Sequence, residues 1–241
     1  MTAPSRADPA ARVLPLGDAA FTLSLPDEPG PQTTARLAAA AARLAQAPGV
    51  VDVAPSFRTL TVHFDPMIAD PAALAALALA ESAAADPAPG ETADWRIPVC
   101  FDADLGPDQD EVAAETGLTP AQAVEMLVET PLTVLAVGFL PGFPFCGMAP
   151  PPLRLKRKAS PRLRVPAGSV AVANGFAGIY PWVSPGGWRI LGNTAVPLFR
   201  PDRPRPAVLA PGDPRRVGAV VSAAPEARGA DPAGPNDRFR A

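Results

Sequence analysis

Apolar and polar residues alternate along the first part of the chain, and this pattern predicts short strands separated by helices. The run VLPLGDAAFTLSL predicts two strands around a turn at Gly17-Asp18, and VVDVAP with FRTLTVHFD predicts a strand pair. PQTTARLAAAAARLAQAPG and DPAALAALALAES predict two helices, the second with Asp70 as N-cap and Pro71 in its first turn. We therefore expect a small α+β domain over residues 13–85, after a disordered tail at residues 1–12.

The pattern changes after a small, proline-rich linker at residues 86–93. WRIPVCF opens a second domain. GPDQDEVAAETG then predicts a helix that ends at Gly117, and TPAQAVEMLVE predicts a second helix that begins at Thr119-Pro120. Short apolar runs divided by glycine and proline follow: LTVLAVGF, SVAVANG, FAGIYP, WRILGNT and VPLFRP. Repeated short strands of this kind predict a closed or nearly closed β-barrel over residues 94–225, and the composition of residues 226–241 predicts a disordered tail.

Composition and charge narrow the range of functions. The chain has 241 residues, 48% of them hydrophobic, and a formal net charge of -3. The one basic cluster, RLKRK at residues 154–158, is short, so no nucleic-acid surface is expected. No apolar run approaches the roughly 20 residues that span a bilayer, and the first residues lack the apolar centre of a signal peptide. These features predict a soluble, cytoplasmic protein with no membrane partner.

Cysteine and histidine are too scarce for several common kinds of site. The two cysteines, Cys100 and Cys146, form no C-x-x-C pair, and a single histidine almost excludes a zinc site of cysteines and histidines. That histidine, His63, alternates with Leu60, Val62 and Phe64, so we expect it on the polar side of a half-buried strand. A histidine-based catalytic triad and a metal centre are therefore not expected.

Three glycine-rich loops interrupt the second domain: LPGFPF at residues 140–145, RVPAGS at 164–169 and SPGGWR at 184–189. Glycines let backbone N–H groups point into a shared cleft, where they can bind a carboxylate, a phosphate or an oxyanion. The other interpretation, that these loops are barrel corners and hairpin turns, stays open. The chain carries no phosphate-loop motif, no dinucleotide fingerprint and no G-x-S-x-G nucleophile motif.

Longer blocks carry a more specific signal. GFLPGFPF, SPRLRVPAGSVAVANG, AGIYPWVSPGGWRILGNT and PLFRP resemble the signature blocks of the allophanate hydrolase subunit 1 family, which includes the B subunit of 5-oxoprolinase and the kinase inhibitor KipI. PLGDAAFTL, FRTLTVHFDP and the start of the second domain resemble the corresponding parts of that family. The match covers nearly the whole chain from Val13 to Pro201.

The resemblance implies a small α+β domain followed by a cyclophilin-like β-barrel. It also implies a partner of the allophanate hydrolase subunit 2 type and, in 5-oxoprolinase, a further lactam-utilisation subunit of the LamB/YcsF type. Together such subunits cleave 5-oxoproline to glutamate at the expense of ATP, so the chain is expected to be inactive alone. A KipI-like regulator of a histidine kinase and a carboxyltransferase component of a urea carboxylase-like enzyme are the alternatives.

For an enzyme subunit that acts on a small amide or lactam, the loops supply the candidate site residues. Arg164 and Arg162 would bind a carboxylate or phosphate, because a guanidinium offers a bidentate fork. The other interpretation of both arginines is surface pairing with nearby acids. Tyr180 would contribute a phenolic hydrogen bond beside Arg164 in catalysis. The expected substrate contacts, apart from Arg162, are Gly142, Phe143, Gly168, Ser169, Ser184, Gly186 and Gly187.

One position departs from the family's pattern. The family usually has a histidine upstream of the Gly138-Phe139 pair that opens the first loop, whereas EMLVET places Leu127 there. Val124, Leu127 and Val128 have the spacing of one apolar helical face, so leucine would add burial. If the family's histidine serves acid/base chemistry or binds an anion, this chain is expected to have altered activity.

Overall fold

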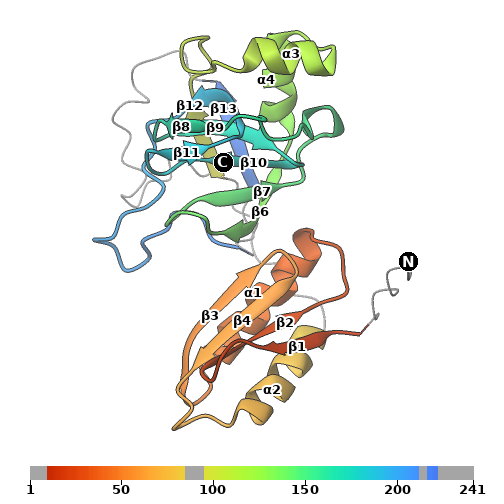
Figure 1. Cartoon of the computed structure of the whole chain (residues 1–241), viewed down its shortest axis with the longest axis vertical. Coiled ribbons are helices and arrows are strands. Elements are labelled where there is room, and N and C mark those ends of the chain that lie inside the picture. Colours follow the sequence, from red (N-terminus) through yellow and green to blue (C-terminus); the bar gives the residue numbers. More distant parts are fainter. Residues whose placement is uncertain (1–9, 85–94, 212–215, 222–241) are drawn as a thin grey trace. The chain divides into compact units, whose positions relative to one another are not determined.

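A computed structural model of the chain describes residues 10–84, 95–211 and 216–221 (Figure 1). The chain divides into two compact units, Met1–Ala88 and Pro89–Ala241, which are described separately below. The linker expected at residues 86–93 and the tail expected at 226–241 lie outside the described residues. Of the tail expected at residues 1–12, Arg12 already belongs to a strand.

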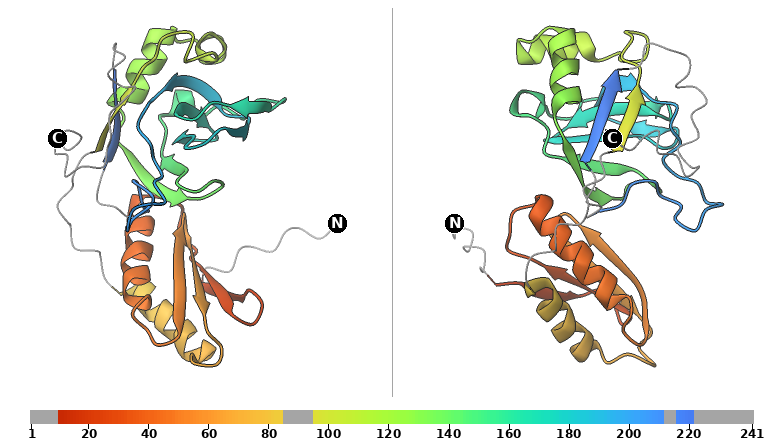
Figure 2. Two further views of the ribbon diagram at one scale, coloured as in Figure 1. Left: turned by 90° about the vertical axis from the view of Figure 1, so that its left-hand side faces the viewer. Right: turned by 180° about the vertical axis from the view of Figure 1, so that it is seen from behind.

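The first unit is a four-stranded antiparallel sheet with two helices on one face (Figure 2). The strands are paired in the order β1-β2-β4-β3. Their bounds are β1 Arg12–Pro15, β2 Ala20–Ser24, β3 Val50–Ser56 and β4 Thr59–Phe64, and the helices are α1 Pro31–Leu44 and α2 Pro71–Ala83. The four strands were predicted from the alternation of apolar and polar residues, and the two helices from their alanine-rich runs and their start signals.

The core of this unit lies between the sheet and the helices. Leu60, Val62 and Phe64 of β4 point into it, whereas His63 is exposed, as its place in the alternation predicts. The Asp70 side chain accepts a hydrogen bond from the backbone N–H of Ala72 at 2.9 Å, which confirms the predicted N-cap of α2.

The second unit is a β-barrel. Its seven strands are paired in the order β12-β9-β10-β7-β6-β13-β5. Beyond β5, the backbone of Cys100 exchanges two hydrogen bonds with Asn193 of β12, so the two ends of the sheet meet and the barrel closes. The bounds are β5 Trp95–Val99, β6 Leu132–Val137, β7 Pro144–Gly147, β9 Ser169–Ala173, β10 Phe176–Ile179, β12 Arg189–Asn193 and β13 Arg216–Val221. This architecture confirms the predicted α+β class and barrel.

A separate two-stranded sheet, β8 (Arg162–Val165) with β11 (Ser184–Gly186), packs against one wall of the barrel. Strand β9 is buried on both faces. Val170 and Val172 belong to the main barrel core, whereas Ala171 and Ala173 belong to a second, aromatic core together with Val165 of β8. The β8–β11 sheet therefore covers the outer face of β9.

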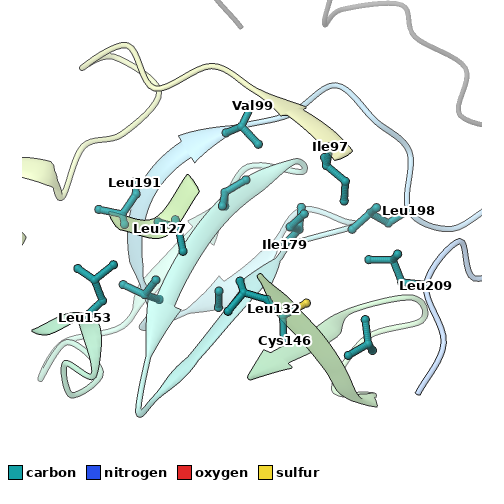
Figure 3. Close-up of a cluster of buried hydrophobic side chains, with 14 of the residues drawn as sticks. Ile97, Val99, Leu127, Leu132, Cys146, Leu153, Ile179, Leu191, Leu198 and Leu209 are labelled. Carbon is teal, nitrogen blue, oxygen red and sulfur yellow. The ribbon is translucent and has the colours of Figure 1, made fainter. Parts of the chain in front are cut away.

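Two helices, α3 (Gln109–Thr116) and α4 (Pro120–Glu129), complete the unit, along with a short 3-10 turn at Pro151–Leu153. Helix α3 ends at Gly117, whose φ of 72° requires a residue that tolerates the left-handed region. Thr119 and Gln122 form a capping box at the start of α4. Leu127 of α4 belongs to the main barrel core, in the same cluster as Leu191 and Leu153 (Figure 3).

The structure differs from the sequence-based expectation in several places. Strands β8, β11 and β13 were not predicted, and β8 and β11 overlap two of the glycine-rich loops. VPLFRP is not a strand, because its segment makes only one isolated bridge, between Phe199 and Ala207. The first glycine-rich loop is shorter than expected, because PFCG continues it as strand β7, which pairs with both β6 and β10. Among the described residues, no helix is both long and apolar enough to cross a membrane.

Candidate functional site

The three glycine-rich loops meet at Tyr180, at the end of β10. The backbone N–H of Tyr180 donates to the carbonyl of Ser169 at 2.9 Å, and its carbonyl accepts from the N–H of Gly168 at 2.7 Å. The ring of Phe143, from the first loop, packs edge-on against the Tyr180 ring at 5.1 Å. Thus the structure brings together segments that lie far apart in the sequence, as the hypothesis of a shared site requires.

The glycines at this meeting point serve close packing. A Cβ at Gly142 would lie 2.7 Å from Cβ of Phe199, and one at Gly186 would collide with the Tyr180 hydroxyl. Gly168 has a φ of 80° and sits directly against the carbonyl of Thr194, and its N–H is already bound to Tyr180. The carbonyl of Gly187 accepts the backbone N–H of Lys158 at 2.7 Å. The glycines thus fit the corner-and-turn interpretation, and the N–H of Gly168 is not available to a ligand.

Phe143 and Tyr180 lie in the aromatic core and not on a surface. Phe143 is the centre of a set of tilted and edge-to-face contacts that includes Phe145 and Trp188. Both Phe143 and Tyr180 are almost fully buried. Burial raises the pKa of the Tyr180 phenol, although a hydrogen bond with the backbone of Trp188 opposes that rise. Both side chains therefore have packing roles in this structure, and their expected roles in catalysis and in substrate contact stay predictions.

The two serines of the proposed site are buried as well. The Ser184 hydroxyl donates only to the carbonyl of the next residue, at 3.2 Å. Ser169 is 2% exposed. No described base stands beside either hydroxyl, so neither has the setting of an activated nucleophile.

Asp108 is the centre of a buried charge cluster that the sequence did not reveal. Its side chain is 2% exposed and accepts two hydrogen bonds from Arg162, at 2.7 and 2.8 Å. It also accepts from the Lys158 ammonium at 2.9 Å and from the backbone N–H of Ile190 at 2.7 Å. Burial favours the neutral acid, but these hydrogen bonds outweigh burial and hold the pKa of Asp108 below its ordinary value.

Further charges of α3 extend this cluster. Glu111 pairs with Lys158 and with Arg189, and Glu115 accepts from Arg189 at 2.7 Å. The hydrogen bond from Lys158 lowers the pKa of Glu111. The α3 charge cluster, as it is called below, consists of Asp108, Glu111, Glu115, Lys158, Arg162 and Arg189. It joins α3 to β8, β12 and the loop before β8, and so has a structural role.

The two candidate arginines of β8 therefore have different surroundings. Arg162 is held in a bidentate pair by Asp108, and so the pairing interpretation applies to it. Arg164 is exposed and makes no ion pair with any described residue. Of the two, Arg164 is the one whose guanidinium has no ion-pair partner among the described residues.

Nothing in the described residues suggests a thiol nucleophile or a metal centre. Burial raises the pKa of the Cys146 thiol to about 12, so it is neutral at physiological pH. No cluster of three or more histidine, cysteine, aspartate or glutamate side chains arranged for a metal ion occurs within residues 10–84, 95–211 and 216–221.

Leu127 also has a packing role. Its side chain is 2% exposed and contacts the barrel core from α4, with Ala123 one helical turn before it. Val124 and Val128, expected on the same buried face, are only partly buried. A titratable side chain at this position would be enclosed by apolar groups, so the packing interpretation is favoured over the chemical one.

Comparison with known protein families gives one match that covers most of the chain. A family model described as the carboxyltransferase domain, subdomain C and D, matches residues 11–209. The B subunit of 5-oxoprolinase from Escherichia coli O157:H7 is 37% identical over 210 residues, which make up 84% of this chain and 93% of that protein. The B subunit of 5-oxoprolinase from Bacillus subtilis is 34% identical over 82% of this chain and 88% of its own length. These matches confirm the predicted family resemblance.

Solved structures with a similar fold also match most of the chain. The crystal structure of TTHA0988 matches 86% of this chain with a TM-score of 0.74 and 36% identity, and the chain spans 40% of that longer protein. The conserved protein PH0987 of Pyrococcus horikoshii matches 90% of this chain and all of its own, with a TM-score of 0.54 and 31% identity. The urea carboxylase of Kluyveromyces lactis shares the fold at 17% identity, with a TM-score of 0.68, and the chain spans 22% of its length.

Proposed function

This chain belongs to the carboxyltransferase-domain family, subdomains C and D, and we propose that it is the B-type subunit of a 5-oxoprolinase. The observation that carries the proposal is the 37% identity to a protein of that name, over 93% of that protein's length. The substrate would be 5-oxoproline or a similar small lactam or amide, opened by hydrolysis of its C–N bond.

ATP would serve as the co-substrate, because phosphorylation of the lactam oxygen makes the C–N bond easier to hydrolyse. Arg164 fits an anionic ligand, since its guanidinium is exposed and unpaired among the described residues. It would hold a carboxylate or phosphate oxygen and stabilise the negative charge that develops in the transition state. Arg164 alone does not neutralise a triphosphate, so the proposal assigns further cations to another protein of the assembly.

The proposed assembly therefore has at least one more subunit, of the allophanate hydrolase subunit 2 type, and includes a lactam-utilisation subunit of the LamB/YcsF type. The relatives are each named as one subunit of 5-oxoprolinase, which implies a complex of several subunits. In this proposal the chain alone is inactive, because none of the buried hydroxyls or thiols described above is placed for catalysis.

The test is reconstitution from purified components. This chain, the subunit 2-like protein and the lactam-utilisation protein of the same organism are assayed singly and together for release of glutamate and phosphate from 5-oxoproline and ATP. Turnover that requires this chain and the others supports the proposal. Assembly without turnover of 5-oxoproline would reject it and favour the regulatory alternative, while full turnover by the chain alone would reject the multi-subunit requirement.

A further inference from the structure

We propose that six exposed residues around β8 and β11 form a docking surface for a second protein subunit, whose own face is apolar at its centre and acidic at its rim. This inference rests on the proposed function and assigns a location to the partner. The β8–β11 patch, as it is called below, consists of Phe139, Pro141, Leu163, Trp182, Val183 and Pro185.

The patch is unusual in the size and exposure of its side chains. Leu163 is 91% exposed and Phe139 is 65% exposed, and Trp182 and Val183 are each nearly half exposed. Single exposed apolar residues are normal on a protein surface, but a group of neighbouring ones marks an interaction site. Phenylalanine and tryptophan are also among the residues that are enriched in protein–protein interfaces.

Strand pairing and one hydrogen bond link the three segments that carry the six residues. In the β8–β11 pairing, Ser184 lies opposite Val165 and Gly186 opposite Arg162, so Leu163 and Pro185 lie between these two pairs. Val183 and Trp182 directly precede Ser184. The indole N–H of Trp182 donates to the carbonyl of Pro141 at 3.0 Å, which joins the β11 side of the patch to the loop that contains Phe139.

The aromatic residues of the patch are held in place before any partner binds. The Trp182 indole is fixed by its hydrogen bond to Pro141 and by an edge contact with Phe199. A rigid anchor loses little conformational entropy on binding, which favours affinity. Phe139 has a φ of 68°, a left-handed backbone that is strained for a bulky side chain. Such strain is typical of functional positions, where the side chain is needed despite its cost to folding.

Charge next to the patch indicates the chemistry of the partner. The segment 154–164, RLKRKASPRLR, holds six cations and no acid, although the chain as a whole has a net charge of -3. The α3 charge cluster neutralises Lys158 and Arg162. Lys156 and Arg157 are exposed and form no ion pair with the described residues. We therefore expect carboxylates at the corresponding positions of the protein surface that covers the patch.

This surface also explains why a partner would be needed at Arg164. Arg164 lies next to Leu163 on β8, where an irregularity in the pairing sets both residues opposite Pro185, so a subunit seated on the patch would lie close to the guanidinium. Removal of water strengthens the attraction between a guanidinium and an anion. The relatives named as one subunit of 5-oxoprolinase and the longer TTHA0988 chain are both consistent with a further protein component beside this fold.

The experiment measures binding by titration calorimetry between the purified full-length chain and the purified subunit 2-like protein of the same organism. Leu163→Asp, Phe139→Asn and the double variant Lys156→Glu/Arg157→Glu are compared with wild type. Asparagine tolerates the left-handed backbone of Phe139, which offsets the loss of the ring contact with Phe143 at 5.6 Å. Met67→Asp is the matched control, since Met67 is 90% exposed but lies in the first unit.

We expect Leu163→Asp and Phe139→Asn each to weaken binding by about tenfold or more, as for residues at the centre of an interface. The double charge variant should weaken it as well, with a loss that shrinks at high salt. Met67→Asp should bind within about twofold of wild type, and all variants should keep the wild-type melting temperature.

Other outcomes would overturn the inference in distinguishable ways. A wild-type complex that the patch variants form equally well would reject the docking surface and leave the proposed function standing. Absence of any wild-type complex would reject the proposed function and this inference with it. A lower melting temperature of Leu163→Asp alone would show that the patch is covered by the chain itself, and a change in self-association would show that a second copy covers it.

Discussion

The α3 charge cluster and the β8–β11 patch share strand β8 but differ in almost every other respect. In the cluster, Arg162 is paired with a carboxylate that is 2% exposed and accepts four hydrogen bonds. Two residues later, Arg164 is exposed and unpaired among the described residues, beside an apolar residue that is 91% exposed. The same residue type therefore completes the fold at one position and remains available for binding at the other.

This difference gives a way to separate structural from functional charges. A charge whose hydrogen-bonding capacity is filled inside the chain contributes to stability, and its removal leaves its partners buried without compensation. A charged side chain without a hydrogen-bond or ion-pair partner inside the chain contributes little to stability, and so its presence is better explained by a ligand or a partner protein. The predictions below vary the two regions in turn.

The largest effect is expected from Asp108→Ala. This change leaves Arg162 and the N–H of Ile190 without their acceptor and leaves Lys158 with Glu111 alone. Loss of one member of a buried pair costs about 3–5 kcal/mol. Chemical denaturation should show this loss in the free energy of unfolding. Asp110→Ala, at an exposed position of the same helix, should change it by less than about 0.5 kcal/mol. Equal effects of the two variants would contradict a structural role for the cluster.

Arg164→Ala should act on the reaction and not on the fold. If the guanidinium holds an anion in the assembled complex, its loss should cost about 2–4 kcal/mol of transition-state stabilisation, measured as the change in kcat/KM. The melting temperature should stay at the wild-type value. Arg162→Ala should show the reverse pattern, with a clear loss of stability. An unchanged rate for Arg164→Ala in a folded complex would remove Arg164 from the site.

Leu127→His tests whether position 127 serves packing or chemistry. The family usually has a histidine there, which suggested acid/base chemistry or anion binding, whereas Leu127 packs in the barrel core. The variant places a polar ring among apolar side chains, so it should lose about 2 kcal/mol of stability. No gain in turnover and no new titration near neutral pH is expected in the reconstituted complex. Leu127→Met is the control, because it keeps apolar volume and should cost less than about 1.5 kcal/mol. A higher rate for Leu127→His would restore the chemical interpretation.

The smallest effect concerns the pH dependence of stability. The folded-state pKa of Asp108 lies below the ordinary value of 3.8, so its contribution is fully present above that value and is lost as the pH falls through the folded pKa. Unfolding measured from about pH 7 to 3 should show that the stability advantage of wild type over Asp108→Asn is constant at first and shrinks at the acid end. A difference that does not change with pH would show that the charge of Asp108 contributes nothing.

Local patterns predicted most of the fold because they report on neighbouring residues. The alternation around His63, the N-cap at Asp70 and the capping box at Thr119 depend on side chains within a few positions of each other. The expectation for VPLFRP was wrong for a related reason. A strand requires a partner strand, and only one bridge is formed there.

The candidate site was less predictable, because its contacts join residues that lie far apart in the chain. The glycine-rich loops indicated segments that come together in the fold. Glycines of this kind are equally suited to present backbone N–H groups to a ligand and to pack closely against an aromatic ring such as that of Tyr180. Only the tertiary structure, which places Tyr180 against Gly168 and Gly186, shows that these glycines are used for packing. Asp108 offered no signal, because nothing in GPDQDE identifies an acid that will meet Lys158, Arg162 and the backbone of Ile190.

The sequence by itself determined the two-part architecture, the helix ends and the family, because these follow from periodicity, capping and long blocks of fixed residue order. The tertiary structure decided which charges are used within the fold and which are left for a partner. That choice depends on burial and on the geometry of acceptors brought in from other elements. Arg162 and Arg164 are alike in sequence and become different only when α3 places the Asp108 carboxylate against one of them.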